Sequence, residues 1–375
     1  MPIFGGQMRL TAEEKLRRYA RDIIGTTDPC LITLQIDLTD FCVCKCKGCE
    51  HWKWPVKTKF DTDVVMKNVF PFPYKTESTL FNNLQSVVLS GGEPLLHQDV
   101  ESIVSHINHR YANVGIITSG LGKNKLDWLT LSKNCRWIRF STDGFTPENY
   151  AATRGVNLFS TWLDNLLTLL DANKKTKCQT RLNVTIHDYN INNFSDNLID
   201  FLLENKLNLD VYFWLSREFI DVLRQEGEAS INLSLKLRNK IDELRDEAKT
   251  KGYPMKLIDV GNVLRHMTGR EAKSYKSCYA AQMFALIAAD GNVFPCCYMY
   301  EPVFAVDKQQ TQFIIGNVNE QSIFDIYNGQ RYKDVVDKFR RCNKKFSQCV
   351  FCDRYDHLNV YLNQYRITDD EPIFL

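Results

Sequence analysis

Six short runs of apolar and β-branched residues alternate with amphipathic stretches in the first 215 residues. The runs are 31–37 (LITLQID), 85–90 (QSVVLS), 114–119 (VGIITS), 136–141 (RWIRFS), 180–186 (TRLNVTI) and 209–215 (LDVYFWL). They are mostly apolar on both faces, which is typical of buried parallel strands. Helical periodicity follows in 99–109, 125–133, 160–172 and 195–203. Repeated strand–helix–strand units predict an α/β fold with a parallel sheet, here a partial (β/α)6 TIM-like barrel.

Polar and glycine-rich segments follow the predicted strands directly. Chemistry in barrels of this kind sits at the C-terminal ends of the strands, so these segments are the candidate site. They are 40–49 after the first strand, Gly91-Gly92-Glu93-Pro94 after the second, Thr118-Ser119 after the third and 141–144 after the fourth.

Length and charge bound the remaining possibilities. The chain has 375 residues, and 47 Lys and Arg against 45 Asp and Glu give a net charge of +2. This balance gives no strong nucleic-acid signature. No apolar run reaches the ~18 residues of a membrane span, and the N-terminus lacks a signal core, which predicts a cytoplasmic protein. We expect an N-terminal extension (1–30), the barrel (31–216), a helical linker (217–269) and a smaller, irregular, cysteine-containing domain (270–375).

Four cysteines crowd into residues 42–49, and Cys42, Cys46 and Cys49 have the spacing C-x3-C-x2-C. Three thiolates suit an iron–sulfur cube and leave one iron open, where S-adenosylmethionine can be chelated and cleaved. The alternative is a structural zinc site, which prefers paired C-x2-C units. Cys44 is interpreted as a bystander.

Cys42, Cys46 and Cys49 after the first strand, with the GGEP segment after the second, resemble the radical S-adenosylmethionine superfamily. The resemblance implies a [4Fe-4S] cluster on these cysteines and S-adenosylmethionine binding at Gly91, Gly92, Glu93 and Pro94. It also implies cofactor contacts from Thr118, Ser119, Ser141, Asp143, Arg154 and Asn183. One departure is Gly48, which stands where the family usually has an aromatic residue near the adenine. His51, Trp52 or Trp54 are the candidates to replace it.

The later cysteines form a second candidate metal site. Asp290-Gly291 predicts a hairpin that returns Cys296 toward Cys278. This part resembles the SPASM/twitch extension of radical S-adenosylmethionine enzymes, and the shorter twitch form is expected. The resemblance implies one auxiliary [4Fe-4S] cluster, with zinc as the alternative. Its predicted ligands are Cys278, Cys296, Cys349 and Cys352, with Cys342 as a competitor.

The predicted activity is hydrogen-atom abstraction by a 5′-deoxyadenosyl radical, followed by oxidation or epimerisation. About 30 residues precede the first strand, fewer than a peptide-recognition domain needs. A small polar substrate is therefore expected: a sugar, cyclitol, nucleoside or amino-acid derivative. A peptide-modifying maturase and a non-catalytic zinc-binding interaction protein are the alternatives. Flavodoxin or ferredoxin is the expected electron donor. Candidate catalytic residues are Glu218, next to Arg217, together with Asp143 and Cys297.

Overall fold

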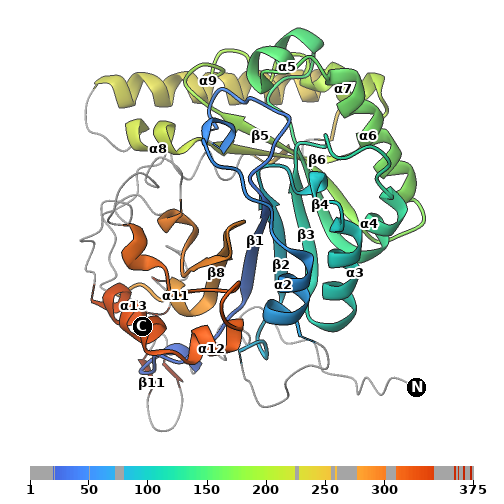
Figure 1. Cartoon of the computed structure of the whole chain (residues 1–375). Helices are drawn as coiled ribbons and strands as arrows, with labels where there is room; N and C mark the ends of the chain where they lie inside the picture. The colour runs from blue at the N-terminus through green and yellow to red at the C-terminus, as the bar shows by residue number, and fades with distance from the viewer. Residues whose placement is uncertain are drawn as a thin grey trace.

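We describe the protein from a computed structural model. The structure describes residues 20, 22–49, 51–71, 80–223, 228–254, 258–259, 277–300, 310–341, 359, 362, 366–367 and 372–373. Figure 1 shows the strands of the barrel at the centre of the molecule and the C-terminal elements on the side of β1.

Six parallel strands form the body of one curved sheet in the order in which they occur along the chain. Their bounds are β1 (Thr33–Thr39), β2 (Ser86–Gly91), β3 (Asn113–Thr118), β4 (Cys135–Ser141), β5 (Gln179–Ile186) and β6 (Asp210–Leu215). Each begins within two residues of its predicted start. The predicted partial (β/α) barrel is confirmed.

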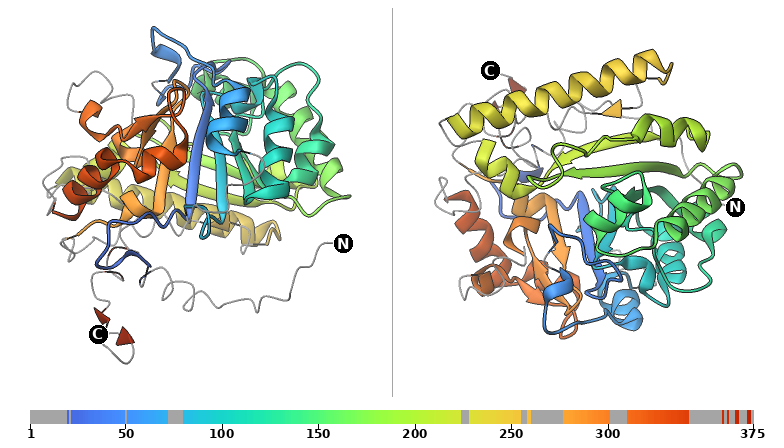
Figure 2. Two further views of the ribbon diagram at one scale, coloured as in Figure 1. Left: turned by 60° about the horizontal axis from the view of Figure 1, so that its bottom comes forward. Right: turned by 90° about the horizontal axis from the view of Figure 1, so that it is seen from above.

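Helices connect these strands and cover one face of the sheet (Figures 1 and 2). They are α3 (Val100–Arg110), α4 (Trp128–Asn134), α5 (Pro147–Arg154), α6 (Phe159–Asn173) and α7 (Leu198–Glu204). The short elements α2 (Thr62–Val64), η1 (His51–Lys53), η2 (Val65–Val69) and η3 (Pro94–Leu96) lie in the first two connections. The sequence prediction missed α5, whose sequence PENYAATR has little apolar periodicity.

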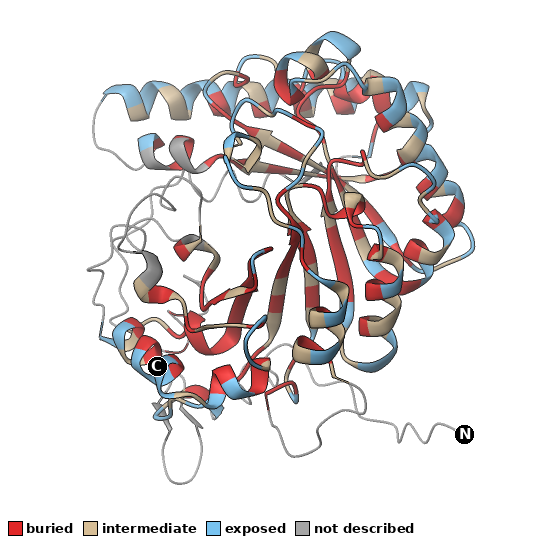
Figure 3. Ribbon diagram, in the orientation of Figure 1, coloured by how far each residue is buried: buried red, intermediate tan, exposed pale blue. Residues whose placement is uncertain are grey.

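The two faces of the sheet differ, contrary to the prediction that both are apolar. The face under the helices holds fully buried side chains such as Leu182, Val184 and Phe213. Figure 3 shows that buried and half-buried positions both occur along the strands. The opposite face, which we call the inner face, carries half-buried polar and aromatic side chains. Among them are Gln35, Arg139, Arg181, Asn183, Tyr212 and Trp214. Strands β4, β5 and β6 therefore alternate between core and inner-face positions.

The sheet continues beyond residue 216 at both edges. Helices α8 (Arg217–Leu223) and α9 (Glu228–Thr250) follow β6, and the short β7 (Ile258–Asp259) then pairs with β6 in parallel. On the other edge β8 (Phe284–Ile287) pairs in parallel with β1. The predicted helical linker thus contains a strand, and the C-terminal part shares the sheet of the barrel.

The C-terminal part has more regular structure than its sequence suggested. After α11 (Ala280–Met283) and β8 come β9 (Asn292–Phe294), η5 (Cys297–Met299), η7 (Gln310–Phe313), β10 (Gly316–Asn317), α12 (Ile323–Asn328) and α13 (Gln330–Arg340). Strands β8 and β9 form the predicted hairpin, and Gly291 has a φ of 86° in its turn. Strands β11 (Arg366–Ile367) and β12 (Pro372–Ile373) form a separate pair.

Within the part of the chain that the structure describes, none of the helices combines the length and apolarity needed to cross a membrane.

Candidate active site

The four cysteines of the first cluster line one cavity at the C-terminal ends of the strands. We call it the cysteine cavity. Its wall also includes Ser90, Gly91 and Gly92 from the end of β2 and Thr118 and Ser119 from the end of β3. Ser141, Asp143, Arg154, Thr185, His187 and Tyr189 complete the opposite side. The structure therefore brings together most of the predicted site residues.

The loop that carries the cysteines is fixed by the C-terminal end of α5. The amide of Lys45 donates to the carbonyl of Arg154 at 2.9 Å, and the amide of Lys47 donates to the carbonyl of Thr153 at 3.1 Å. Gly155 ends α5 with a φ of 68°, and a Cβ there would lie 2.5 Å from the carbonyl oxygen of Lys45. Glycine at this position lets the helix end approach the cysteine loop.

Gly91 and Gly92 allow the GGEP segment to cross directly behind the cysteine loop. The amide of Gly92 donates to the carbonyl of Thr39 at 2.7 Å, and the amide of Glu93 donates to the carbonyl of Phe41 at 2.8 Å. A Cβ on Gly92 would lie 2.4 Å from the oxygen of Phe41. The glycines therefore permit close approach of two backbone segments, as well as forming part of the cavity wall.

The Glu93 carboxylate is a structural anchor and does not belong to the cavity wall. It is fully buried and accepts from the amide of Leu95 at 2.9 Å, the hydroxyl of Thr118 at 2.6 Å and the amide of Ser119 at 2.6 Å. The Ser119 hydroxyl also donates to it. Burial raises the pKa of Glu93, although these donors act in the opposite direction. Both carboxylate oxygens accept hydrogen bonds, so Glu93 positions Thr118 and Ser119. Pro94, the next residue, is buried in η3.

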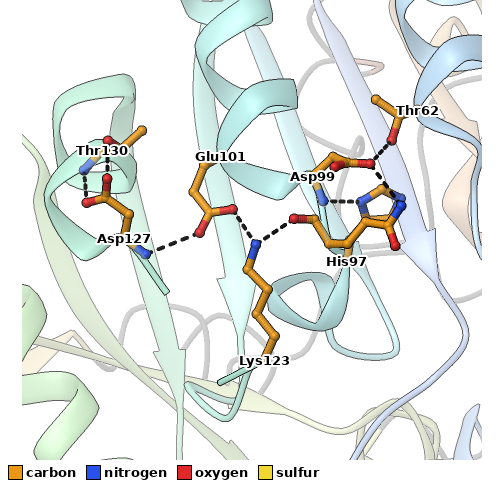
Figure 4. A network of polar contacts seen from close by, with 8 residues as sticks. Thr62, His97, Asp99, Glu101, Lys123, Asp127 and Thr130 are labelled. Atoms are coloured by element: carbon orange, nitrogen blue, oxygen red, sulfur yellow. Dashed lines mark hydrogen bonds and ion pairs between the residues drawn. The ribbon is translucent and has the colours of Figure 1, made fainter. Parts of the chain in front are cut away.

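His97 connects the GGEP segment to the chain that follows the cysteine loop. Its Nδ1 accepts from the amide of Asp99 at 3.2 Å, so Nε2 is the protonated nitrogen and donates to the carbonyl of Phe60 at 2.8 Å. Asp99 in turn accepts from the Thr62 hydroxyl at 2.6 Å, as Figure 4 shows. Burial lowers the pKa of His97, in accord with a neutral ring.

Arg154 joins Asp143 to the cluster cysteines. Its Nε lies 3.3 Å from Asp143 Oδ2, and its Nη1 donates to Cys46 Sγ at 3.4 Å. Burial alone would lower the pKa of Arg154, but Asp143 and Cys46 raise it above its ordinary value, so the guanidinium stays charged. The other Asp143 oxygen accepts from the amide of Thr185 at 2.8 Å. These contacts position Arg154 and β5, and because Asp143 also lines the cavity, its role as a base stays a prediction.

Cys44 differs from the other three cysteines of the loop in its surroundings. It is buried in the apolar core, whereas Cys42, Cys46 and Cys49 are half-buried. A hydrogen bond with Cys42 raises the pKa of Cys44 to about 12. Among the described residues, no three Cys, His, Asp or Glu side chains are grouped around a position for a single metal ion. Ligation by Cys42, Cys46 and Cys49 therefore stays a proposal, supported by the partial exposure of these three thiols in the cavity that all four cysteines line.

The aromatic residues proposed to replace a ring at Gly48 lie elsewhere. His51 stacks on Trp54 at a centroid distance of 4.6 Å, and Trp54 meets Tyr300 edge-on at 5.9 Å. Trp52 donates from its indole to the carbonyl of Cys46 at 3.0 Å. None of the three belongs to the wall of the cysteine cavity as the structure describes it. The sequence prediction missed His187 and Tyr189, which do belong to it.

The remaining predicted residues are placed only in part. Asn183 lies on the inner face beside Ser141, and its Oδ1 is buried without a hydrogen-bond partner among the described residues. Glu218 and Arg217 begin α8, but the structure does not describe their side chains. Cys297 is half-buried in η5, next to the buried Cys296.

The structure describes the first two of the four cysteines that are predicted to hold the auxiliary cluster. Cys278 precedes α11 and accepts from the side-chain amide of Asn359 at 3.4 Å, while Cys296 follows β9. Cys342, Cys349 and Cys352 lie outside the described residues. Tyr300, at the end of this segment, packs on Trp54 of the first cysteine loop, and burial raises its pKa. The segment that follows the hairpin thus contacts the part of the chain just after the first cysteines.

Comparison with known proteins agrees with this geometry. Residues 278–354 match the SPASM family, an iron–sulfur cluster-binding domain. A relative from Pyrococcus furiosus, the tungsten-containing aldehyde ferredoxin oxidoreductase cofactor-modifying protein, is 23% identical over 337 residues, which cover 86% of this chain and 87% of the relative.

Two solved structures share the fold. Streptococcus suis SuiB bound to its precursor peptide SuiA has a TM-score of 0.56 and 15% identity, covering 97% of this chain and 80% of SuiB. The anSMEcpe protein with bound AdoMet and a Cp18Cys peptide has a TM-score of 0.54 and 17% identity, covering 88% of each chain.

The fold, the cysteine motif and the domain match are together similar to those of radical S-adenosylmethionine proteins. Residues 278–354 match the SPASM family of iron–sulfur cluster-binding domains, and these similarities support S-adenosylmethionine and iron–sulfur clusters as cofactors.

Proposed function

We propose that the protein oxidises or epimerises a small polar substrate by radical chemistry started in the cysteine cavity. One observation carries the proposal. The three motif cysteines share a cavity with the Gly91-Gly92 backbone, the hydroxyls of the β2, β3 and β4 ends, and Arg154. When bound, the cluster and S-adenosylmethionine supply a 5′-deoxyadenosyl radical, which takes a hydrogen atom from a substrate C–H bond.

The residues of the cavity suit the two ends of that cofactor. Cys42, Cys46 and Cys49 would hold the cluster. The Arg154 guanidinium, kept charged by Asp143, would attract the carboxylate of the methionine part, and carbonyl and hydroxyl groups near Ser90 and Ser119 would accept from its ammonium. Ser141 would bind the ribose hydroxyls.

The substrate would lie against the inner face below the cavity. That face carries Gln35, Asn183 and Arg181 with the rings of Tyr212 and Trp214, a surface able to bond hydroxyl groups and pack on a carbon ring. The unpartnered Oδ1 of Asn183 supports a ligand contact there, because a buried acceptor without a partner is costly. Glu218 as base and Cys297 as hydrogen-atom donor remain proposals.

A second candidate is modification of a peptide. It is supported by SuiB and anSMEcpe, which were solved with peptides and whose folds cover most of this chain. The Pyrococcus furiosus relative modifies a cofactor, which instead supports a small molecule.

The auxiliary site would pass an electron to or from the substrate radical. We assign its cluster to Cys278, Cys296, Cys349 and Cys352, as a single [4Fe-4S] centre in a domain spanning 270–375. The packing of Tyr300 on Trp54 supports this assignment, since it brings the Cys296 segment against the first cysteine loop.

An acidic electron carrier such as flavodoxin or ferredoxin would reduce the first cluster. Residues 41–59 contain five lysines and one glutamate, a net charge of +4, although the whole chain carries only +2. The same loop exposes Phe41 (48%) and Val56 (70%). Exposed apolar residues among lysines are suited to binding an acidic protein surface.

The proposed function is tested with protein reconstituted anaerobically with iron and sulfide. We expect about eight iron atoms per chain, from two cubes of four. With a reductant, S-adenosylmethionine should be converted to methionine and 5′-deoxyadenosine. Colourless protein with bound zinc at the motif cysteines would instead support the zinc-binding interaction protein.

A further inference from the structure

A further pocket lies at the N-terminal ends of β3, β4 and β5. Its wall comes from three segments that are far apart in the sequence. They are the end of α3 with the start of β3 (108–113), the end of α4 with the start of β4 (132–136), and the loop before β5 (173–178). The cysteine cavity lies at the C-terminal ends of the strands, so the two pockets occupy opposite ends of the sheet. We call this one the basal pocket.

Positive charge gathers around the basal pocket. Lys133, Arg136 and Lys177 line it, and all three are exposed. The segments 108–113, 132–136 and 173–178 contain six Lys and Arg residues and no Asp or Glu, although the whole chain has a net charge of only +2. Across the residues that the structure describes, no carboxylate forms an ion pair with any of the three lining cations.

The ends of three helices offset only part of this charge. Helices α3, α4 and α6 pack side by side and have their C-terminal ends in these segments (Figure 1). Each helix C-terminus carries roughly half a negative charge, about −1.5 for the three. One further cation, Lys174, is paired with Asp171 at 3.0 Å. The six cations still exceed the local negative charge by about three to four elementary charges, so this end of the sheet attracts anions.

The buried residues of the wall form a fixed and uncharged floor. The Ser132 hydroxyl donates to Asn173 Oδ1 at 2.6 Å, and the Asn173 side-chain amide donates to Thr180 Oγ1 at 2.7 Å. These bonds hold the loop before β5 in place. Burial raises the pKa of Cys178 to about 12 and that of Cys135 well above its ordinary value. Both thiols are therefore neutral near pH 7 and do not repel an anion.

We propose that the basal pocket binds a phosphate group, either as the free ion or as the monoester of a small molecule. Its volume of about 160 Å³ is below the ~300–1,000 Å³ of pockets that enclose a drug-sized ligand, so it suits a compact anion. The Arg136 guanidinium can bond two phosphate oxygens, and Lys133 and Lys177 supply point charges. The side-chain amides of Asn108 and Asn113 add donors to the wall.

Isothermal titration calorimetry of the reconstituted full-length protein with inorganic phosphate, in about 0.15 M sodium chloride, tests the proposal. We expect a Kd below about 1 mM. Arg136→Gln and Lys177→Gln should each weaken binding roughly 10- to 100-fold, the range of one charge-assisted hydrogen bond. Lys236→Gln removes the same charge from an exposed position of α9, so it is the matched control and should bind like wild type.

Glycerol 3-phosphate distinguishes the two sources of the phosphate group. Binding at least as tight as that of inorganic phosphate would identify a phosphorylated small molecule as the ligand, and weaker binding would identify the free ion. A Kd above about 1 mM for both probes would overturn the phosphate site. So would unchanged affinity in Arg136→Gln and Lys177→Gln, or an equal loss in Lys236→Gln. Cleavage of S-adenosylmethionine should not change in Arg136→Gln, because this residue lies at the other end of the sheet.

Discussion

Arg154 and Asp143 form a buried ion pair in the wall of the cysteine cavity, with Nε and Oδ2 3.3 Å apart. Removal of the carboxylate would leave a buried guanidinium without its counter-charge. We expect Asp143→Ala to lower the free energy of unfolding by about 3–5 kcal/mol in urea titrations. The matched control is Asp171→Ala at the exposed pair with Lys174, where a change of about 0–1 kcal/mol is expected. A similar decrease in the free energy of unfolding in both variants would contradict the conclusion that Arg154 is a buried charge paired with Asp143.

The cysteines of the first loop should differ in their effect on the cluster. Alanine at Cys42, Cys46 or Cys49 should remove the iron of the first cube, about half of the total, and abolish formation of 5′-deoxyadenosine. Cys44→Ala should retain the iron, because this thiol is buried in the core. Iron analysis and electron paramagnetic resonance of the reduced variants measure both effects. Loss of the cluster in Cys44→Ala would show that the ligand assignment is wrong.

His97 should make the fold sensitive to acid. Its folded-state pKa is lowered, so the unfolded chain takes up a proton first as the pH falls below about 6.5, and the stability that the neutral ring provides is lost from there downward. Protonation of Nδ1 also breaks the hydrogen bond that the Asp99 amide donates to this nitrogen. The slope contributed by one such group is at most about 1.4 kcal/mol per pH unit.

The measurement compares His97→Gln with wild type. Urea unfolding at about pH 7.5 and about pH 5 should show a smaller loss of stability for the variant, since all other groups titrate in both proteins. Equal losses would mean that His97 is not a source of the acid sensitivity.

The lysines of the cysteine loop should control reduction by a protein donor. Lys45→Glu and Lys53→Glu should each slow reduction of the first cluster by flavodoxin several-fold, and so should a rise from about 50 mM to about 300 mM salt. Reduction by photoreduced deazaflavin, a small molecule, should change little. Lys175→Glu, on the connection after α6, is the control. An unchanged rate of cluster reduction by flavodoxin in Lys45→Glu and Lys53→Glu would exclude this loop as the docking surface.

The six barrel strands could be predicted because each is a short β-branched run bounded by turn residues, a pattern typical of buried strands. Helix α13 was missed, although Tyr332, Val335, Val336 and Phe339 are buried at helical spacing. Its many charges hid that pattern. The inner face was also missed, because RWIRFS and LDVYFWL were interpreted by their overall apolarity and not by their alternation.

Within the site, sequence spacing identified the cysteines and the glycines but not the use of each side chain. Glu93 is a conspicuous acid in a loop, yet its carboxylate oxygens accept hydrogen bonds from Thr118, Ser119 and Leu95. These hydrogen bonds depend on how β2 and β3 end. His187 could be found only from the tertiary contact with Gly48, 139 positions earlier (187 − 48). The absent side chain at Gly48 was the one available signal.

The pairing of β8 with β1 makes the two parts of the chain mutually dependent. Thr33, Leu34, Gln35 and Ile36 are aligned with Phe284, Ala285, Leu286 and Ile287. A fragment cut before residue 277 would leave the backbone of β1 as an open edge able to recruit other chains, so the shortened protein should self-associate. We therefore expect the C-terminal part to protect the barrel from aggregation, independently of any cluster that it holds.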